Sequence, residues 1–166
     1  MPGVGGAARK IASWPAGGVH PVQPQWSPDS TQLAYTLGAS AGPMIEMLTL
    51  ASGATRTIRL PARPRNNMVI DLRWSPDGRW LAYARAISPI AATAELWLTD
   101  PSDGTSVNLT DGTMRDFSPA WPPDSGSLYF ISDRSGTRDL WRFTLGPGGV
   151  PEGAPQQIAA GIEMNS

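Results

Sequence analysis

The chain has 166 residues and a formal net charge of −1, from 13 lysines and arginines against 14 aspartates and glutamates. This balance argues against a nucleic-acid-binding protein, because neutralising a phosphate backbone requires clustered positive charge. Cysteine is absent and His20 is the only histidine, which excludes disulfide scaffolds, thiolate zinc sites and multi-histidine metal sites built from this chain alone. The 18 glycines, 17 prolines and 40% hydrophobic residues indicate a globular protein rich in turns and strands. No apolar run approaches the ~18 residues that span a bilayer.

The first predicted element is a short strand over residues 8–13. Its sequence, Ala-Arg-Lys-Ile-Ala-Ser, resembles residues 156–160 near the end of the chain, and a glycine-containing linker follows each of the two. We therefore expect residues 8–13 to form an outer strand at the N-terminus. This strand would belong to a sheet that precedes the first complete four-stranded sheet and whose other strands are not in this sequence.

A motif that recurs three times dominates the rest of the chain. The copies begin at residues 26, 74 and 121, and in each copy the tryptophan precedes a leucine by seven residues and a second aromatic residue by nine. Proline followed by aspartate and then by glycine or serine favours a tight turn, so each copy predicts a β-hairpin. The motif positions are Trp26, Pro28, Asp29, Leu33 and Tyr35; Trp74, Pro76, Asp77, Gly78, Leu81 and Tyr83; and Trp121, Pro123, Asp124, Leu128 and Phe130.

Two more strands are predicted after each hairpin. They cover residues 44–50 and 55–60 in the first copy, 94–99 and 105–110 in the second, and 139–144 and 156–160 in the third. Four short strands in ~47 residues are typical of a β-propeller blade, and no helical periodicity is sustained. The sequence therefore predicts an all-β partial β-propeller of three four-stranded antiparallel blades, over residues 20–62, 67–112 and 115–160.

Apolar residues on both faces of each predicted blade indicate that the blades pack against one another. Trp26, Trp74 and Trp121 recur in register, so we expect them between blades. Trp97 and Trp141 also align, and Met47 is assigned to the same slot, so these three are expected in the interior as well.

Three blades do not close a ring, because propellers have four to eight of them. We therefore expect a part of a larger propeller, or a ring whose remaining blades come from another chain. In a chain made alone, the outer faces of the first and third blades lack a neighbour and are expected to favour association.

The repeat carries a family resemblance. The pattern Trp-Ser-Pro-Asp-Gly-x-x-Leu-Ala-Tyr at residues 74–83, with Ser-Asp-Arg-x-Gly at 132–136 and Leu-Trp at 140–141, resembles the WD40-like propeller repeats of the TolB type. The resemblance covers about residues 8–162. Pro122 stands where the family has serine. In the first and second copies, the segments 37–43 and 86–93 stand in place of the Ser-Asp-Arg-x-Gly turn, so we expect these two loops to carry features that are specific to this chain.

This resemblance implies a fold more strongly than a function. Such repeats form the C-terminal propeller of TolB, a periplasmic protein that binds partners of an envelope-spanning complex. Similar blades precede the hydrolase domain of prolyl oligopeptidase and dipeptidyl-peptidase relatives. They also occur as sensor or scaffold domains fused to bacterial kinases and regulators.

Three recurring carboxylates have two possible roles. Asp29, Asp77 and Asp124 are either a ring that binds a cation or a set of turn caps that accept backbone N–H groups. Turn capping is favoured, since aspartate after proline is what such a turn prefers.

Four other residues are candidates for contact with a ligand or partner. Trp14 and Trp80 do not recur in the repeat, so they are better candidates for exposed contact residues than the recurring tryptophans. Arg134 and Arg138 lie beside aspartates around one turn, where they either contact a ligand or form a surface ion-pair cluster, and such pairs stabilise little.

No catalytic set is recognised. There is no phosphate-binding Gly-x-x-x-x-Gly-Lys, and His20 precedes Pro21 in a linker with no partner for a triad. The glycine-rich segment 145–153 is interpreted as a flexible loop. We expect neither enzymatic activity nor a cofactor.

The function that follows is a non-catalytic interaction or scaffold module for a protein or peptide partner. One alternative is the non-catalytic propeller of a prolyl oligopeptidase-type serine peptidase, with its chemistry in another domain. A propeller enzyme with a channel-bound metal is a further alternative. The start of the chain has no apolar stretch typical of a signal peptide, and only the family resemblance favours a periplasmic or other extracytoplasmic location.

Overall fold

The computed structural model describes residues 10, 13, 21–39, 42–61, 68–87 and 93–161. The predicted strand over residues 8–13 lies outside the described part except for Lys10 and Ser13, which are not in a strand. Trp14 and His20 also lie outside it. Within the described residues the chain forms twelve β-strands and one short 3-10 helix.

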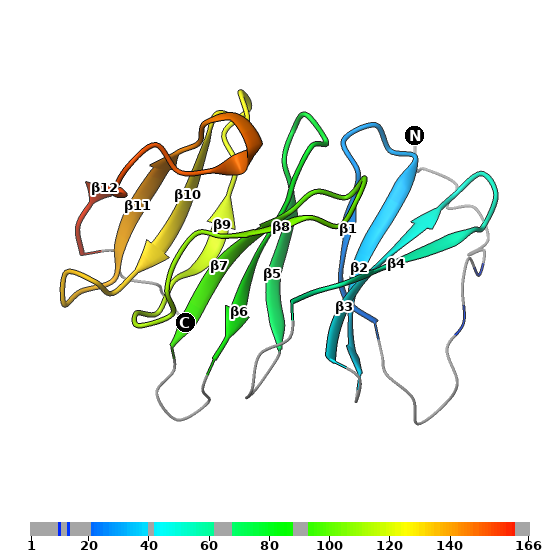
Figure 1. Cartoon of the computed structure of the whole chain (residues 1–166), viewed down its shortest axis with the longest axis horizontal. Coiled ribbons are helices and arrows are strands. Elements are labelled where there is room, and N and C mark those ends of the chain that lie inside the picture. Colours follow the sequence, from blue (N-terminus) through cyan, green and yellow to red (C-terminus); the bar gives the residue numbers. More distant parts are fainter. Residues whose placement is uncertain are drawn as a thin grey trace, which may run out of the picture.

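The strands form three four-stranded antiparallel sheets, each built from four consecutive strands. Figure 1 shows the sheets side by side in an arc. The fold is the predicted all-β partial propeller. The first sheet contains β1 (Pro21–Trp26), β2 (Gln32–Ala39), β3 (Gly42–Thr49) and β4 (Thr55–Arg59); the second β5 (Val69–Trp74), β6 (Leu81–Ala86), β7 (Ala94–Thr99) and β8 (Ser106–Asn108); and the third β9 (Phe117–Ala120), β10 (Ser127–Ser132), β11 (Asp139–Thr144) and β12 (Gln156–Ala159), with η1 (Pro147–Gly149) before β12.

A hairpin turn joins the first two strands of each sheet, and the three turns lie along one edge of the molecule, at the top of Figure 1. In the second sheet, Ser75 Oγ donates to Asp77 Oδ1 over 2.6 Å and accepts from the Trp80 N–H over 2.8 Å. Ser27 and Asp29 make the same hydroxyl–carboxylate bond in the first sheet, also at 2.6 Å. The turn chemistry visible in the sequence therefore closes both hairpins through one network.

The first strand of each sheet carries one bulged position with left-handed backbone. The φ angle is +57° at Gln23, +57° at Asp71 and +52° at Ser118, and the pairing with the second strand shifts register nearby. Bulges re-aim side chains. Here Gln23 Oε1 accepts from the Leu72 N–H and Asp71 Oδ2 from the Ser118 N–H, each over 3.1 Å. These bonds link the first strands of neighbouring sheets.

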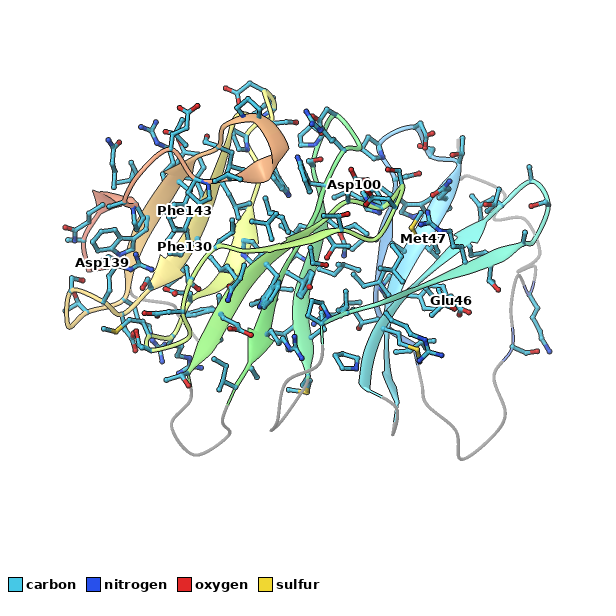
Figure 2. All side chains as sticks on the ribbon, viewed as in Figure 1. Glu46, Met47, Asp100, Phe130, Asp139 and Phe143 are labelled. Atoms are coloured by element: carbon cyan, nitrogen blue, oxygen red, sulfur yellow. The ribbon has the colours of Figure 1, made fainter. Side chains whose placement is uncertain are left out.

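Two apolar cores lie between the sheets. Because alternate residues of β6 point to opposite faces, Leu81 and Tyr83 join the first core, whereas Ala82 and Ala84 join the second. The second sheet is therefore covered on both faces. The first core also contains Ala34, Ile45, Met47, Ile58, Leu72 and Trp97. The second also contains Trp80, Leu96, Leu98, Leu128, Phe130 and Phe143, and Phe130 and Phe143 stack with their centroids 5.1 Å apart (Figure 2).

The interior position expected for Trp26 is wrong, because its side chain is 57% exposed. Trp74 and Trp121 pack against the first and second cores respectively. Each of these two meets the sheet that precedes its own, and no described sheet precedes the first one. The repeat thus predicts the face of the sheet on which the tryptophan lies, but the tryptophan is buried only where another sheet packs on that face.

The candidate role of Trp80 as an exposed contact residue is also wrong, since its side chain is only 7% exposed. The glycine-rich segment 145–153, expected to be a flexible loop, instead packs over it through η1. A Cβ atom added at Gly149 would lie 3.0 Å from Trp80 Cζ2 and 3.0 Å from Leu98 Cδ1. Trp80 fills the space beneath this loop, which explains a tryptophan that does not recur.

Glu46, and not Met47, occupies the slot that holds Trp97 in the second sheet. Strand pairing places Glu46 opposite Tyr35, as it places Trp97 opposite Tyr83. Met47 is one residue away and therefore points to the other face, where it is buried in the first core. Figure 2 labels both residues on the first sheet.

Candidate functional site

A cleft of about 510 Å³ opens at the hairpin-turn edge, between the first and second sheets. Both Ser-Pro-Asp turns contribute to its walls. The apolar side chains of Met47 and Trp74 line it, as does Arg56 of β4. The β7–β8 turn contributes Pro101 and Ser102. The cleft therefore combines an aromatic ring, a cation and turn segments from two sheets.

The aspartates of this cleft are engaged by their own turns. Asp29 Oδ1 accepts from Ser27 Oγ over 2.6 Å and from the N–H of Thr31 over 3.0 Å. The hydrogen bond from the Ser27 hydroxyl, together with those from Thr31, holds the pKa of Asp29 below its ordinary value. Asp77 Oδ1 accepts from Ser75 Oγ and from the Arg79 N–H.

Asp124, the third member of the recurring set, accepts from the Gly126 N–H over 2.9 Å. The three carboxylates thus have the geometry of turn caps. Among the residues that the structure describes, no group of three or more histidine, cysteine or acidic side chains could hold a metal ion.

Arg56 connects the two walls of the cleft, because its Nη1 donates to the carbonyl of Pro101. Trp74 also lines the cleft, and its Nε1 is buried and has no hydrogen-bond partner among the residues that the structure describes. The cleft can therefore offer a ring surface for stacking and a guanidinium for a carboxylate or carbonyl. Arg56, Pro101 and Ser102 were not predicted as site residues, since none of them belongs to the recurring motif.

A second cleft, of about 460 Å³, lies between the β8–β9 connection and the third sheet. Arg134 lines this cleft. The expectation that it pairs with the aspartates around its own turn is wrong. Arg134 Nη2 pairs with Asp116 Oδ1 over 2.9 Å, and the guanidinium lies 5.1 Å from the ring centroids of both Phe130 and Trp141. These contacts hold Arg134 in place and anchor the β10–β11 turn.

The other members of the expected cluster are also placed differently. Asp133 Oδ1 accepts from the Arg115 N–H over 3.0 Å, and Asp139 accepts from Ser135 and Gln157. Arg138 is exposed in the turn. The aspartates therefore brace loops and strands of the third sheet rather than pairing with the nearby arginines.

The comparisons with known proteins agree with this architecture. A model of the TolB β-propeller domain matches residues 17–157. The chain belongs to the TolB β-propeller domain family. Within the described residues of this TolB-family chain, no helix has the length and apolar character needed to cross a membrane.

Curated relatives of this TolB-family chain are larger proteins. It is 37% identical over 71 residues to the uncharacterized peptidase YuxL of Bacillus subtilis, covering 41% of this chain and 11% of the relative. It is 27% identical over 125 residues to a TolB homologue of Chlorobium luteolum, covering 75% of this chain and 27% of the relative. The chain therefore spans about a tenth to a quarter of the length of these proteins.

Among solved structures, TolB from Acinetobacter baumannii superposes with a TM-score of 0.61 at 24% sequence identity. The match covers 80% of this chain and 32% of that one. It supports the propeller fold of the TolB-family chain.

Proposed function

We propose that this chain is a non-catalytic interaction module that binds a protein or peptide segment in the cleft between its first and second sheets. The observation that carries the proposal is the joint construction of this cleft. Turns from two sheets form its walls, Trp74 and Met47 supply an apolar surface, and Arg56 supplies positive charge. Loops presented by a rigid sheet scaffold commonly carry recognition.

The chemistry of the cleft indicates an extended segment with an aromatic or aliphatic side chain next to a carboxylate. The apolar group packs on the ring of Trp74, and the carboxylate accepts from the guanidinium of Arg56.

Peptide selection tests this proposal. Random peptides displayed on phage are panned against the immobilised protein, and the affinity of an enriched peptide is measured by titration calorimetry. The variant Ser102→Arg fills the cleft and is expected to weaken binding at least about tenfold, because it occupies the contact surface. Ala51→Arg places the same side chain in the β3–β4 turn, outside the cleft, and leaves binding unchanged. Failure to enrich any peptide, or equal binding by the two variants, rejects the proposal.

A second candidate function is that of a propeller domain of a serine peptidase. The 37% identity to the peptidase YuxL over 71 residues supports it. The native protein, isolated from its source with an antibody against this chain, is treated with a fluorophosphonate probe that labels reactive serines. A labelled polypeptide carrying this chain is expected under the peptidase hypothesis, and an unlabelled one rejects it.

We also propose an extracytoplasmic location, on the basis of family membership. Cell fractionation with the same antibody tests it. The chain is expected in the periplasmic or extracellular fraction, and recovery with a cytoplasmic marker enzyme argues against the proposal.

A further inference from the structure

The cleft of about 510 Å³ between the first and second sheets, here called the turn-edge cleft, has an equivalent space between the second and third sheets. Gln32 and Trp80 hold the same position after the hairpin turns of the first and second sheets. The N–H of Gln32 donates to Ser27 Oγ over 2.9 Å, and the N–H of Trp80 donates to Ser75 Oγ over 2.8 Å. Gln32 lines the turn-edge cleft, whereas Trp80 lies in the core between the second and third sheets. Both side chains therefore project from the same point toward the sheet that follows.

The walls of the two spaces also correspond. Strand register gives Met47 and Leu98 the same position in the first and second sheets. Met47 lines the turn-edge cleft, and Leu98 is buried in the second core. Trp74 and Trp121, as the first residues of the recurring motif, take the same position on the opposite wall, and each packs against the core of its interface. The two spaces are thus built on the same plan.

The two spaces differ in what fills them. Between the second and third sheets the indole of Trp80 is buried, and η1 packs over it, so that an added Cβ atom at Gly149 would lie 3.0 Å from Trp80 Cζ2. In the turn-edge cleft the smaller Gln32 stands in place of the indole, and the β7–β8 turn contributes Pro101 and Ser102. A volume of about 510 Å³ stays open there. The second interface therefore shows which side chain suits a space of this construction.

A guanidinium accompanies the ring between the second and third sheets. Arg79 Cζ lies 5.7 Å from the ring centroid of Trp80. In the turn-edge cleft Arg56 is a wall residue, and Val107 holds its equivalent position in the second sheet. Arginine is attracted to the face of an aromatic ring, and to tryptophan most strongly. The turn-edge cleft therefore supplies its own cation where the other interface has an aliphatic residue.

We propose that the turn-edge cleft accepts a tryptophan side chain of the bound protein or peptide segment, in the place that Trp80 fills between the second and third sheets. The inference rests on the proposed function and names the residue that the bound segment supplies. Its indole packs against Met47 and Trp74 and contacts the guanidinium of Arg56. A leucine side chain leaves part of this volume unfilled and makes no contact between a ring and a cation.

Titration with the neutral probe N-acetyl-L-tryptophanamide tests the inference on the intact chain. Heteronuclear NMR follows the side-chain amide of Gln32 and the indole N–H of Trp74. The probe is expected to shift both signals saturably, and N-acetyl-L-leucinamide is expected to bind at least about tenfold more weakly. Equal affinities for the two probes, or no saturable shift of these signals by the tryptophan probe, overturn the proposal.

The variant Gln32→Trp places the same ring in the cleft from within the chain. It is expected to abolish binding of the tryptophan probe and to raise the melting temperature by about 2–4 °C, as cavity-filling substitutions do. Ala51→Trp adds the same side chain in the exposed β3–β4 turn, outside the cleft, and is expected to change neither. A Gln32→Trp variant that still binds the probe, or that melts below Ala51→Trp, contradicts the proposal.

The peptides selected on phage separate this inference from the proposed function. Enriched peptides whose tryptophan cannot be replaced by leucine without an at least about tenfold loss of affinity support both. Peptides that lack an aromatic residue, but lose binding in Ser102→Arg, uphold the interaction role and overturn the choice of tryptophan. Failure to enrich any peptide rejects the interaction role, and the probe titration then decides independently whether the cleft accepts an indole.

Discussion

The Asp71 carboxylate accepts hydrogen bonds from both the backbone N–H and the hydroxyl of Ser118, over 3.1 and 3.3 Å. The two residues occupy the same bulged position in consecutive sheets. In the preceding pair, Gln23 takes the acceptor role toward the Leu72 N–H. Pro119, the residue that corresponds to Leu72, has no N–H to satisfy, which is why proline is tolerated at the bulge. A side chain on the first strand of the first and of the second sheet thus accepts a hydrogen bond from the irregular backbone of the next sheet's first strand.

Replacing Asp71 by alanine is expected to lower the free energy of unfolding by about 1.5–3 kcal/mol, because a charged acceptor is lost and the Ser118 N–H is left without its partner. Asp71→Asn keeps an acceptor oxygen and is expected to cost less. Urea unfolding at pH 7 measures both. Equal, near-zero costs for the two variants would show that the bond does not hold the sheets together.

Trp80 and Trp26 are expected to respond differently to alanine substitution. Removing the buried Trp80 leaves a cavity under the 145–153 loop and is expected to cost about 3–5 kcal/mol. Removing the exposed Trp26 is expected to change stability by no more than about 0.5 kcal/mol in the absence of self-association. Both are measured by denaturant titration at a protein concentration at which the chain is monomeric. A larger loss for Trp26 than for Trp80 would contradict the observed burial.

Gly149 is required where the η1 loop meets the second sheet. Its φ is +73°, and an added Cβ atom would lie 3.0 Å from both Leu98 and Trp80. Gly149→Ala is therefore expected to cost about 1–3 kcal/mol more than Gly148→Ala, whose φ is +74° but whose Cβ would meet nothing within 4 Å. Thermal unfolding of the two variants isolates the packing contribution, and equal costs would show that the loop does not pack there.

Asp139 is expected to make stability depend on acid pH. The hydrogen bond from Ser135 above all, and those from Gly161, Thr137 and Gln157, lower the pKa of this carboxyl from its ordinary 3.8. A lowered pKa in the folded state stabilises the protein above about pH 4, and this contribution is lost as the pH falls through the lowered value. Asp139→Asn is expected to reduce stability at pH 7 and to flatten its decline between pH 4 and pH 2. Urea unfolding across that range measures the decline, and an unchanged slope in the variant would reject this role.

The hairpins and the sheet count were predictable because the determinants are local and recur. Pro-Asp followed by glycine or serine specifies each turn, and the spacing of Trp74, Leu81 and Tyr83 sets the flanking strands. The assignment of Met47 to the slot of Trp97 and Trp141 was wrong, because it relied on residue type alone. Matching residue types placed the methionine beside the tryptophans, although the strand register, set by the pairing with β2, gives that slot to Glu46.

Burial and the candidate cleft were less predictable, because they depend on contacts between segments far apart in the chain. Trp80 is covered by a loop that follows almost seventy residues later, and Trp26 lacks the neighbouring sheet that Trp74 has. The bulge residues Gln23, Asp71 and Ser118 do recur at the period of the repeat. Their side-chain types differ, however, so the shared role is visible only in the backbone and its hydrogen bonds.

The central claim is that the second sheet is held between the other two, and hydrogen–deuterium exchange resolved by strand tests it most directly. The measurement is made at a low protein concentration, so that self-association does not contribute. Amides of β6 are expected to exchange at least about tenfold more slowly than those of the equivalent strands β2 and β10, because apolar packing on both faces suppresses local opening. Exchange in β6 that is as fast as in β2 and β10 would contradict the stacked arrangement.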